Sequence, residues 1–148
     1  MLIVKEMRSK YGRIEVLHGI DLQVNAGEIV TVVGANGAGK TTLLRCLSGV
    51  HPISGGSIQF RGEPLTNVPA FRRIYKGLAQ SPEGRQIFTN LSVEENLRLG
   101  AFQFKDDRVA KDMDEAFQMF PILKEKRNLP AGGLSGGQQQ MLAMSREI

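Results

Sequence analysis

The pattern of apolar and polar positions changes near Gln80, from a strand-like to a helical period. Before it, short apolar runs alternate with polar residues and end at glycines, which predicts strands over 2–7, 14–17, 20–24 and 57–61. A short helix over 69–76 and a brief strand over 77–79 close this part. Beyond it, apolar residues recur three or four positions apart, which predicts helices over 92–101, 106–120, 122–127 and from 135 onward. We therefore expect an α/β fold with a strand-based part, 1–80, and a helical part, 81–148.

One apolar run differs from the others because it hardly alternates. Ile29–Val33 predicts a buried strand of a parallel core, next to the antiparallel strands. The apolar spacing of 40–50 predicts a helix soon after it. Between the two lies Gly34-Ala-Asn-Gly-Ala-Gly-Lys-Thr-Thr42, which fits the pattern G-x-x-x-x-G-K-[ST]. Its glycines let backbone N–H groups face a phosphate at a helix N-terminus, Lys40 can reach the terminal phosphates and Thr41 can offer a hydroxyl to magnesium.

Composition narrows the class of protein. With 148 residues, of which 41% are hydrophobic, the chain suits one domain with a real core. A net charge of +4, spread along the sequence, and few aromatic residues argue against nucleic-acid binding. The single cysteine, Cys46, excludes an internal disulfide and is predicted to be a small core residue. Lys5 and Glu6 interrupt the first apolar run, and no run of about 18 apolar residues follows, so we expect no signal peptide and no membrane span.

A second glycine motif, Leu134-Ser-Gly-Gly-Gln138, begins the last predicted helix. It combines a hydroxyl, two glycines and a helix N-terminus, which are the groups that can hold a phosphate. A flexible helix cap would use the same residues, so the motif alone leaves both interpretations open. Its occurrence in the same chain as the first glycine loop favours phosphate binding.

Together these motifs resemble the ATP-binding domains of ABC proteins, P-loop NTPases with an antiparallel β subdomain and a helical subdomain. Gly34–Thr41 resembles the Walker A loop, Leu134–Gln138 the ABC signature and Gln80 the Q-loop glutamine. The resemblance implies ATP and Mg²⁺ as cofactors, with Gln80 catalytic and Thr41 and Gln80 near the metal. It assigns to the nucleotide Tyr11, Gly34, Ala35, Asn36, Gly37, Ala38, Gly39, Lys40, Thr41, Thr42, Leu134, Ser135, Gly136, Gly137 and Gln138. In this family a Walker A loop and the signature of a second subunit close on one ATP. Tyr11 would stack on adenine, although a strand-end tyrosine packed on its neighbours is the simpler alternative.

A narrower resemblance rests on residues 79–88 and 91–97, which are similar to the ATP-binding subunits of branched-chain amino acid importers of the LivF type. It implies that ATP binding and hydrolysis drive uptake of branched-chain amino acids. The implied partners are membrane permease subunits, a second ABC ATPase subunit and, indirectly, a periplasmic or extracellular substrate-binding protein. The implied location is the cytoplasmic face of the cell membrane. Urea or short-amide importers share these features, and Ser81 and Gln138 depart from the usual pattern.

The resemblance stops where the sequence does, at Arg146-Glu147-Ile148. The family's Walker B strand, D-loop and switch histidine would follow, and we interpret His18 and His51 as ordinary surface or loop residues that cannot replace them. We therefore expect an incomplete core sheet, which lacks the strand beside Ile29–Val33. We also expect this chain to bind ATP without hydrolysing it alone, as a truncated, fragmentary or split protein. The alternatives are a non-transport ABC ATPase and a non-catalytic nucleotide-binding module.

Overall fold

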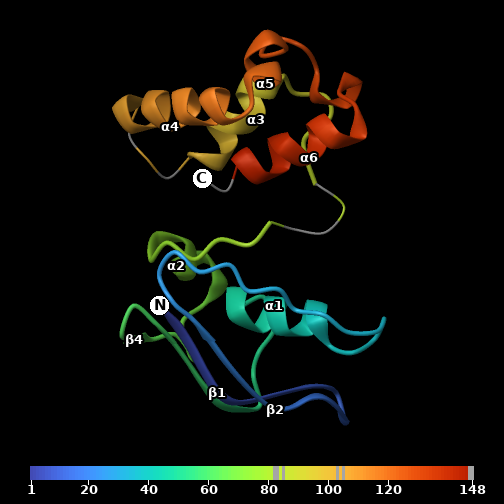
Figure 1. Cartoon of the computed structure of the whole chain (residues 1–148), viewed down its shortest axis with the longest axis vertical. Helices are drawn as coiled ribbons and strands as arrows, with labels where there is room; N and C mark the ends of the chain where they lie inside the picture. The colour runs from blue at the N-terminus through green and yellow to red at the C-terminus, as the bar shows by residue number, and fades with distance from the viewer. Residues whose placement is uncertain (82–83, 85, 103, 105, 147–148) are drawn as a thin grey trace. The chain divides into compact units, whose positions relative to one another are not determined.

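The chain folds as two compact units, Met1–Gln80 and Ser81–Ile148 (Figure 1). The computed structural model describes residues 1–81, 84, 86–102, 104 and 106–146, without the side chains of 106 and 107. Each unit has a hydrophobic core of its own. Among the described residues, no helix is both long enough and apolar enough to cross a membrane.

The first unit is built on an antiparallel sheet with the strand order β2-β1-β3-β4. Its strands are β1 (Leu2–Tyr11), β2 (Ile14–Val24), β3 (Gly55–Phe60) and β4 (Glu63–Pro64). The predicted strands over 2–7 and 57–61 are confirmed, and the first is longer than expected. The two strands predicted over 14–17 and 20–24 are one strand, because Gly19 adopts φ +88° and the pairing with β1 continues past it.

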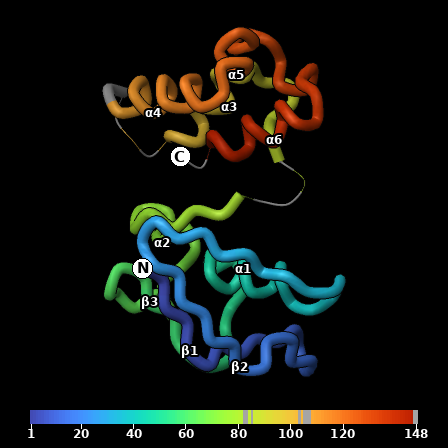
Figure 2. Tube along the Cα trace, viewed as in Figure 1, coloured from blue at the N-terminus to red at the C-terminus, as the bar shows by residue number. Residues whose placement is uncertain are grey.

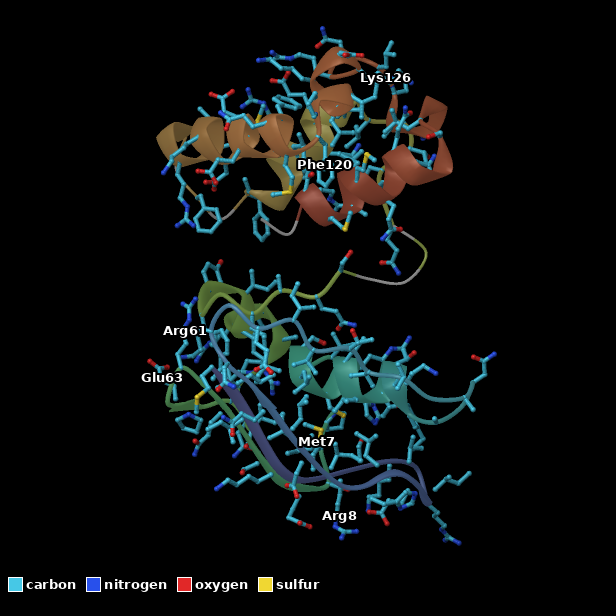
Figure 3. All side chains as sticks on the ribbon, in the orientation of Figure 1. Met7, Arg8, Arg61, Glu63, Phe120 and Lys126 are labelled. Atoms are coloured by element: carbon cyan, nitrogen blue, oxygen red, sulfur yellow. The ribbon has the colours of Figure 1, made fainter. Side chains whose placement is uncertain are left out.

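One face of this sheet carries the core. Val4, Met7 and Ile58 are fully or almost fully buried and pack in one cluster with Leu43 and Cys46 of α1 (Lys40–Ser48). Figure 3 shows Met7 pointing from β1 toward α1, whereas Arg8 points away from it. The first unit also contains the short helix α2 (Ala70–Tyr75), so both helices expected in it are confirmed.

The buried strand predicted over Ile29–Val33 is absent. The segment pairs with none of the described strands, and the side chains of Ile29 and Val33 are 95% and 84% exposed. A strand needs a neighbour that accepts and donates its backbone hydrogen bonds, and the described residues place none beside this segment. The described strands include no parallel pair, so the core sheet is incomplete here, and the brief strand predicted over 77–79 is also absent.

The second unit is helical, as predicted (Figure 2). Its helices are α3 (Val93–Gly100), α4 (Asp106–Met119), α5 (Pro121–Glu125) and α6 (Gly136–Ser145), with a 3₁₀ turn at Ala131–Gly133. The helices pack around one cluster of buried side chains that includes Val93, Leu97, Met113, Phe117, Leu123 and Leu142. The period of three to four residues in the sequence therefore marks the faces that meet in this core.

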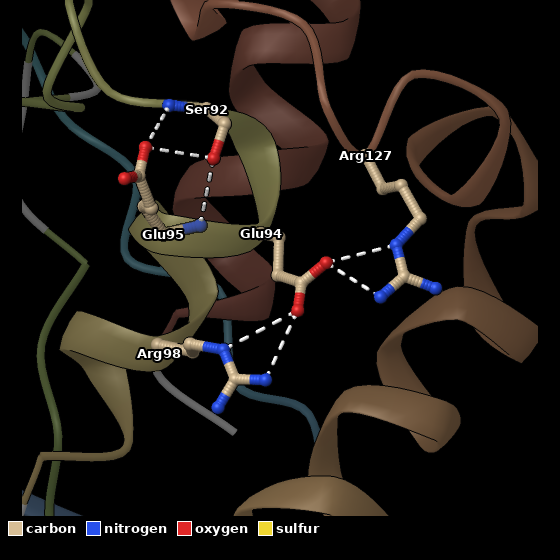
Figure 4. A network of polar contacts seen from close by, with 5 residues as sticks. All are labelled: Ser92, Glu94, Glu95, Arg98 and Arg127. Atoms are coloured by element: carbon tan, nitrogen blue, oxygen red, sulfur yellow. Dashed lines mark hydrogen bonds and ion pairs between the residues drawn. The ribbon is translucent and has the colours of Figure 1, made fainter.

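The start of α3 shows why this segment is a helix (Figure 4). Ser92 Oγ accepts a hydrogen bond from the backbone N–H of Glu95, and the Glu95 carboxylate accepts one from the backbone N–H of Ser92. This capping box satisfies N–H groups that a helix start leaves without partners. The hydrogen bond from the Ser92 backbone, joined by one from its hydroxyl, lowers the pKa of Glu95.

Glu94 joins α3 to the end of α5 (Figure 4). Its carboxylate accepts hydrogen bonds from Arg127, at 2.6 and 2.8 Å, and from Arg98, at 3.0 and 3.3 Å. These bonds lower the pKa of Glu94, with Arg127 as the larger cause. Two guanidinium groups thus hold one carboxylate that is only 17% exposed, which fixes α3 against the chain that follows α5.

Candidate functional site

The glycine loop, Gly34–Gly39, is closed by the lysine that follows it. The ammonium of Lys40 donates hydrogen bonds to the carbonyl oxygens of Gly34, at 2.7 Å, and Ala35, at 2.8 Å. The backbone N–H of Ala38 donates to the same Ala35 carbonyl at 3.2 Å. The loop therefore wraps around the lysine side chain and keeps the positive charge at its centre.

Gly39 is required where the loop becomes α1. It caps the helix with φ +90°, a conformation that favours glycine. A Cβ there would also lie 3.0 Å from Leu17 Cδ2 and 3.3 Å from Val16 Cγ1, because β2 passes close to the loop. The hairpin formed by β1 and β2 therefore packs closely against the turn at which α1 begins.

The N-terminus of α1 is suited to an anion. No side chain caps it, and its first turn contains no acidic residue, so neither a capping oxygen nor a carboxylate competes for the backbone N–H groups of the helix start. The positive end of the helix dipole adds to the charge of Lys40. Backbone N–H groups of a helix start, a helix dipole and an ammonium at one place are the elements of a phosphate-binding loop.

The two residues predicted to lie near the metal are Thr41, at the start of α1, and Gln80, after α2. Thr41 follows Lys40 in the first turn of α1 and is half-buried, and Gln80 is half-buried in the extended segment after α2. Among the described residues, no group of three His, Cys, Asp or Glu side chains could hold a metal ion. A single threonine hydroxyl suits a Mg²⁺ ion that is bound together with a nucleotide. Such an ion takes most of its ligands from phosphate oxygens and water and few from the protein.

The opposite end of α1 is held by Arg73, which sequence reasoning did not select. This side chain is 3% exposed and donates hydrogen bonds to the carbonyl oxygens of Cys46, at 2.9 Å, and Leu47, at 2.6 Å. It also donates to the carbonyls of Leu65 and Val68, both at 2.8 Å. Arg73 thereby satisfies carbonyls at the end of α1 and ties the helix to the segment that leads into α2.

Tyr11 ends β1 with its side chain 43% exposed. Its ring stacks on the imidazole of His51, with the ring centroids 4.2 Å apart and the planes 23° from parallel. The tyrosine is therefore packed on a neighbour, as the simpler interpretation held, and also remains accessible. His51 is therefore not an ordinary loop residue. Its contact with Tyr11 could not be predicted from the sequence, because forty positions separate the two residues.

The signature segment, Leu134–Gln138, forms the start of α6. Leu134 is buried, and Ser135, Gly136 and Gly137 are exposed. Ser135 Oγ accepts from the backbone N–H of Gln138, and the Gln138 side chain accepts from the backbone N–H of Ser135, so this helix also begins with a capping box. The glycines leave backbone N–H groups open to solvent at the helix start, as a phosphate contact requires.

Lys126 adds a positive charge beside this segment. Its ammonium donates a hydrogen bond to the amide oxygen of Gln138 at 3.2 Å. In the described part of the chain, no carboxylate lies within ion-pair distance of Lys126. Sequence patterns do not predict this contact, because it depends on how α5 and α6 pack.

The predicted site residues thus fall into two groups. Tyr11, the glycine loop and Gln80 belong to the first unit, and the signature segment belongs to the second. Of the stretch 79–88 that carries the narrower resemblance, Pro82, Glu83 and Arg85 lie outside the described residues.

The strand hairpin, glycine loop and helix of the first unit define an α/β protein with a glycine loop at a helix start, and comparisons with known proteins identify its family. The sequence model described as "ABC transporter" matches residues 17–148. The chain belongs to this family of ABC transporter proteins.

Two curated relatives narrow the comparison. The chain is 45% identical over its full length to the high-affinity branched-chain amino acid transport ATP-binding protein BraG of Pseudomonas aeruginosa. It is 35% identical, also over its full length, to the probable branched-chain amino acid transport ATP-binding protein LivF of Archaeoglobus fulgidus. The chain spans 64% and 63% of the lengths of these relatives.

Solved structures confirm the fold. A nucleotide-free ATP-binding cassette from an ABC transporter superimposes with a TM-score of 0.86 at 24% identity, over 99% of this chain and 64% of that one. The dimeric ATP-binding cassette MJ0796, bound to ADP and Pi, gives a TM-score of 0.81 at 21% identity, over 100% of this chain and 69% of that one. The expected ABC ATPase fold is therefore correct, with its core sheet incomplete in the described residues.

Proposed function

We propose that this chain binds ATP with Mg²⁺ as part of the ATP-binding subunit of a branched-chain amino acid importer. The observation that carries the proposal is the glycine loop, with Lys40 at its centre and the uncapped N-terminus of α1 behind it. The names of the two relatives, BraG and LivF, support the substrate class over urea or short amides.

Each group of the first unit has a role in this proposal. Lys40 and the N–H groups at the start of α1 bind the β- and γ-phosphates, and the hydroxyl of Thr41 reaches the Mg²⁺ that these phosphates hold. Tyr11 stacks on the adenine. Gln80 contacts the metal and the attacking water, in the manner that the family resemblance implies. These contacts capture the nucleotide, and we assign its hydrolysis to the assembled transporter.

The signature segment takes part through a second subunit. We propose that Ser135 and the N–H groups of Gly136 and Gly137 contact the γ-phosphate of an ATP bound by another copy or another ABC subunit. The dimeric form of the cassette MJ0796 with ADP and Pi is a precedent within the fold. The two ATP-binding subunits would contact permease subunits at the cytoplasmic face of the membrane. Their movement would be transmitted to the permease through these contacts.

Replacing Lys40 with alanine tests nucleotide capture. The change removes a charge-assisted phosphate contact worth about 1.5 to 3 kcal/mol, so the Kd for MgATP should rise roughly ten- to a hundredfold. Isothermal titration calorimetry measures it, with Lys111→Ala on the exposed face of α4 as the control for loss of one positive charge. An unchanged Kd for Lys40→Ala would refute the assignment of the loop.

Replacing Ser135 with arginine tests the shared site. The larger side chain should leave MgATP binding by the single chain unchanged, since the first unit supplies those contacts, and should abolish ATP-dependent association with a complete ABC subunit. Sedimentation velocity with and without MgATP measures the association. If Ser135→Arg abolished MgATP binding by the single chain together with the ATP-dependent association, the result would contradict a site shared between two subunits.

A further inference from the structure

The stacked pair of Tyr11 and His51 joins two segments that sequence analysis treated separately. Tyr11 is the last residue of β1, and His51 follows α1 by three residues. The centroid separation of 4.2 Å and the small interplanar angle place the two rings in direct face contact. One face of the tyrosine ring is therefore covered by the imidazole, and Tyr11 as a residue is still 43% exposed.

The imidazole is fixed by contacts that do not involve Tyr11. Its Nε2 lies 3.2 Å from the carbonyl oxygen of Lys10, and because a carbonyl only accepts, Nε2 carries a proton and donates. The backbone N–H of His51 donates to the carbonyl of Arg45 in α1 at 3.1 Å. The strand thus holds the ring of His51, and the helix holds its backbone.

The loop that carries His51 is fastened along β1. Ser9 Oγ donates to the carbonyl of Pro52 at 3.1 Å, and the backbone N–H of Ser54 donates to the carbonyl of Arg8 at 2.7 Å. Together with the bond from His51 to Lys10, this gives contacts to three successive residues of the strand. These contacts, one between backbone groups and two from side chains, set the position of the imidazole relative to the end of β1.

α1 connects this pair to the glycine loop. Lys40, at the centre of the loop, is the first residue of α1, and Arg45, which holds the backbone of His51, lies in the same helix. The β1–β2 hairpin, which turns just after Tyr11, also lies close to the loop at Gly39 through Val16 and Leu17. The tyrosine ring and the phosphate loop thus rest on the same two elements.

We propose that His51 is a positioning residue for the nucleobase: it covers one face of Tyr11 and holds that ring so that the opposite face receives a purine. The proposal rests on the ATP-binding function proposed above. A tyrosine at a strand end loses side-chain freedom when a base stacks on it, and a ring that is already held loses less. Aromatic pairs contribute enough beyond their buried area to change a binding constant several-fold.

Two replacements of His51 separate stacking from hydrogen bonding. His51→Phe keeps a ring against Tyr11 and loses the bond to Lys10, whereas His51→Gln keeps an N–H donor and loses the ring. His18→Gln, an exposed histidine on β2, is the matched control. The Kd values of MgATP and of magnesium tripolyphosphate, which has no base, are measured for each variant by calorimetry. Quenching of 2-aminopurine riboside triphosphate fluorescence reports the stacking directly.

We expect His51→Gln to weaken MgATP binding about three- to tenfold and to reduce the quenching, while tripolyphosphate binding stays unchanged. His51→Phe should remain within about twofold of the wild type. Equal affinity of all variants for MgATP, tighter binding by His51→Gln, or an equal loss for tripolyphosphate would each overturn the proposal. Wild-type protein that shows no Lys40-dependent MgATP binding would overturn the proposed function instead.

Discussion

At the scale of single residues, the second unit depends on one carboxylate. Glu94 is held by Arg98 from its own helix and by Arg127 from beyond α5. The pKa of Glu94 is lowered by these bonds, so the folded state binds the proton less readily than the unfolded state. The stabilisation is fully present above the ordinary glutamate pKa and is lost as the pH falls through the lower, folded value.

Replacing Glu94 with glutamine should therefore have an effect that depends on pH. At pH 7 we expect the free energy of unfolding to fall by about 1 to 2 kcal/mol, because two charge-assisted contacts are lost. Below about pH 4 the difference from the wild type should shrink, since the wild-type carboxylate is then becoming protonated. Urea unfolding followed by circular dichroism between pH 3 and 7 measures both values.

Glu115→Gln provides the control for Glu94. Glu115 pairs with Lys111 at 3.8 Å on the surface of α4, and both side chains are more than half exposed. Its replacement should change stability by less than about 0.5 kcal/mol. A loss for Glu94→Gln that stayed the same from pH 7 to pH 3 would contradict an ionic origin.

At the scale of elements, α1 is controlled at both ends. Gly39 and the passing strand β2 set its start, and the buried Arg73 closes its end through the carbonyls of Cys46 and Leu47. No carboxylate of the described residues pairs with Arg73. Backbone carbonyls and the negative end of the helix dipole provide its electrostatic partner.

Replacing Arg73 with methionine should destabilise the first unit by about 3 kcal/mol, because buried carbonyls lose a charged donor. Arg73→Lys should recover part of this, since an ammonium has three donors but lacks the planar geometry of a guanidinium. Arg72→Met, at the exposed neighbouring position, should cost less than about 0.5 kcal/mol. Equal losses at positions 72 and 73 in urea unfolding would disprove this role.

Local patterns predicted the elements well where the contacts are local. The apolar spacing of residues 92–148 and the Ser92–Glu95 capping box gave the helices of the second unit, because their determinants lie within one or two turns. Ile29–Val33 shows the opposite case, since its apolar pattern suits a buried strand but pairing depends on residues elsewhere. The contacts of His51, Arg73 and Lys126 were not predicted for the same reason: each spans segments that only folding brings together.

At the scale of the whole molecule, Ile29–Val33 is the most exposed apolar stretch of the first unit. It combines high strand propensity with the absence of charge and proline. A segment of this kind pairs readily with the same segment of another copy. We therefore expect the isolated chain to self-associate through these residues.

Replacing Ile29 and Val33 together with lysine should reduce self-association. The free energy of unfolding should change by less than about 0.5 kcal/mol, because both side chains are exposed. Light scattering against concentration measures the association, and Ile14→Lys, at a 70% exposed position of β2, is the matched control. Association that persists unchanged in the double variant would place the contact elsewhere.

The two capping boxes of the second unit differ in one chemical group, with consequences for the electric field at each helix start. At α3 the third helical residue, Glu95, brings a full negative charge against the backbone N–H groups. At α6 the same position holds Gln138, whose neutral amide accepts the same backbone bond and also touches Lys126. One helix start is thus self-neutralised and the other keeps its positive potential. Replacing Glu95 with glutamine and Gln138 with glutamate, which exchanges one oxygen and one nitrogen between the two positions, would invert which helix start attracts an anion.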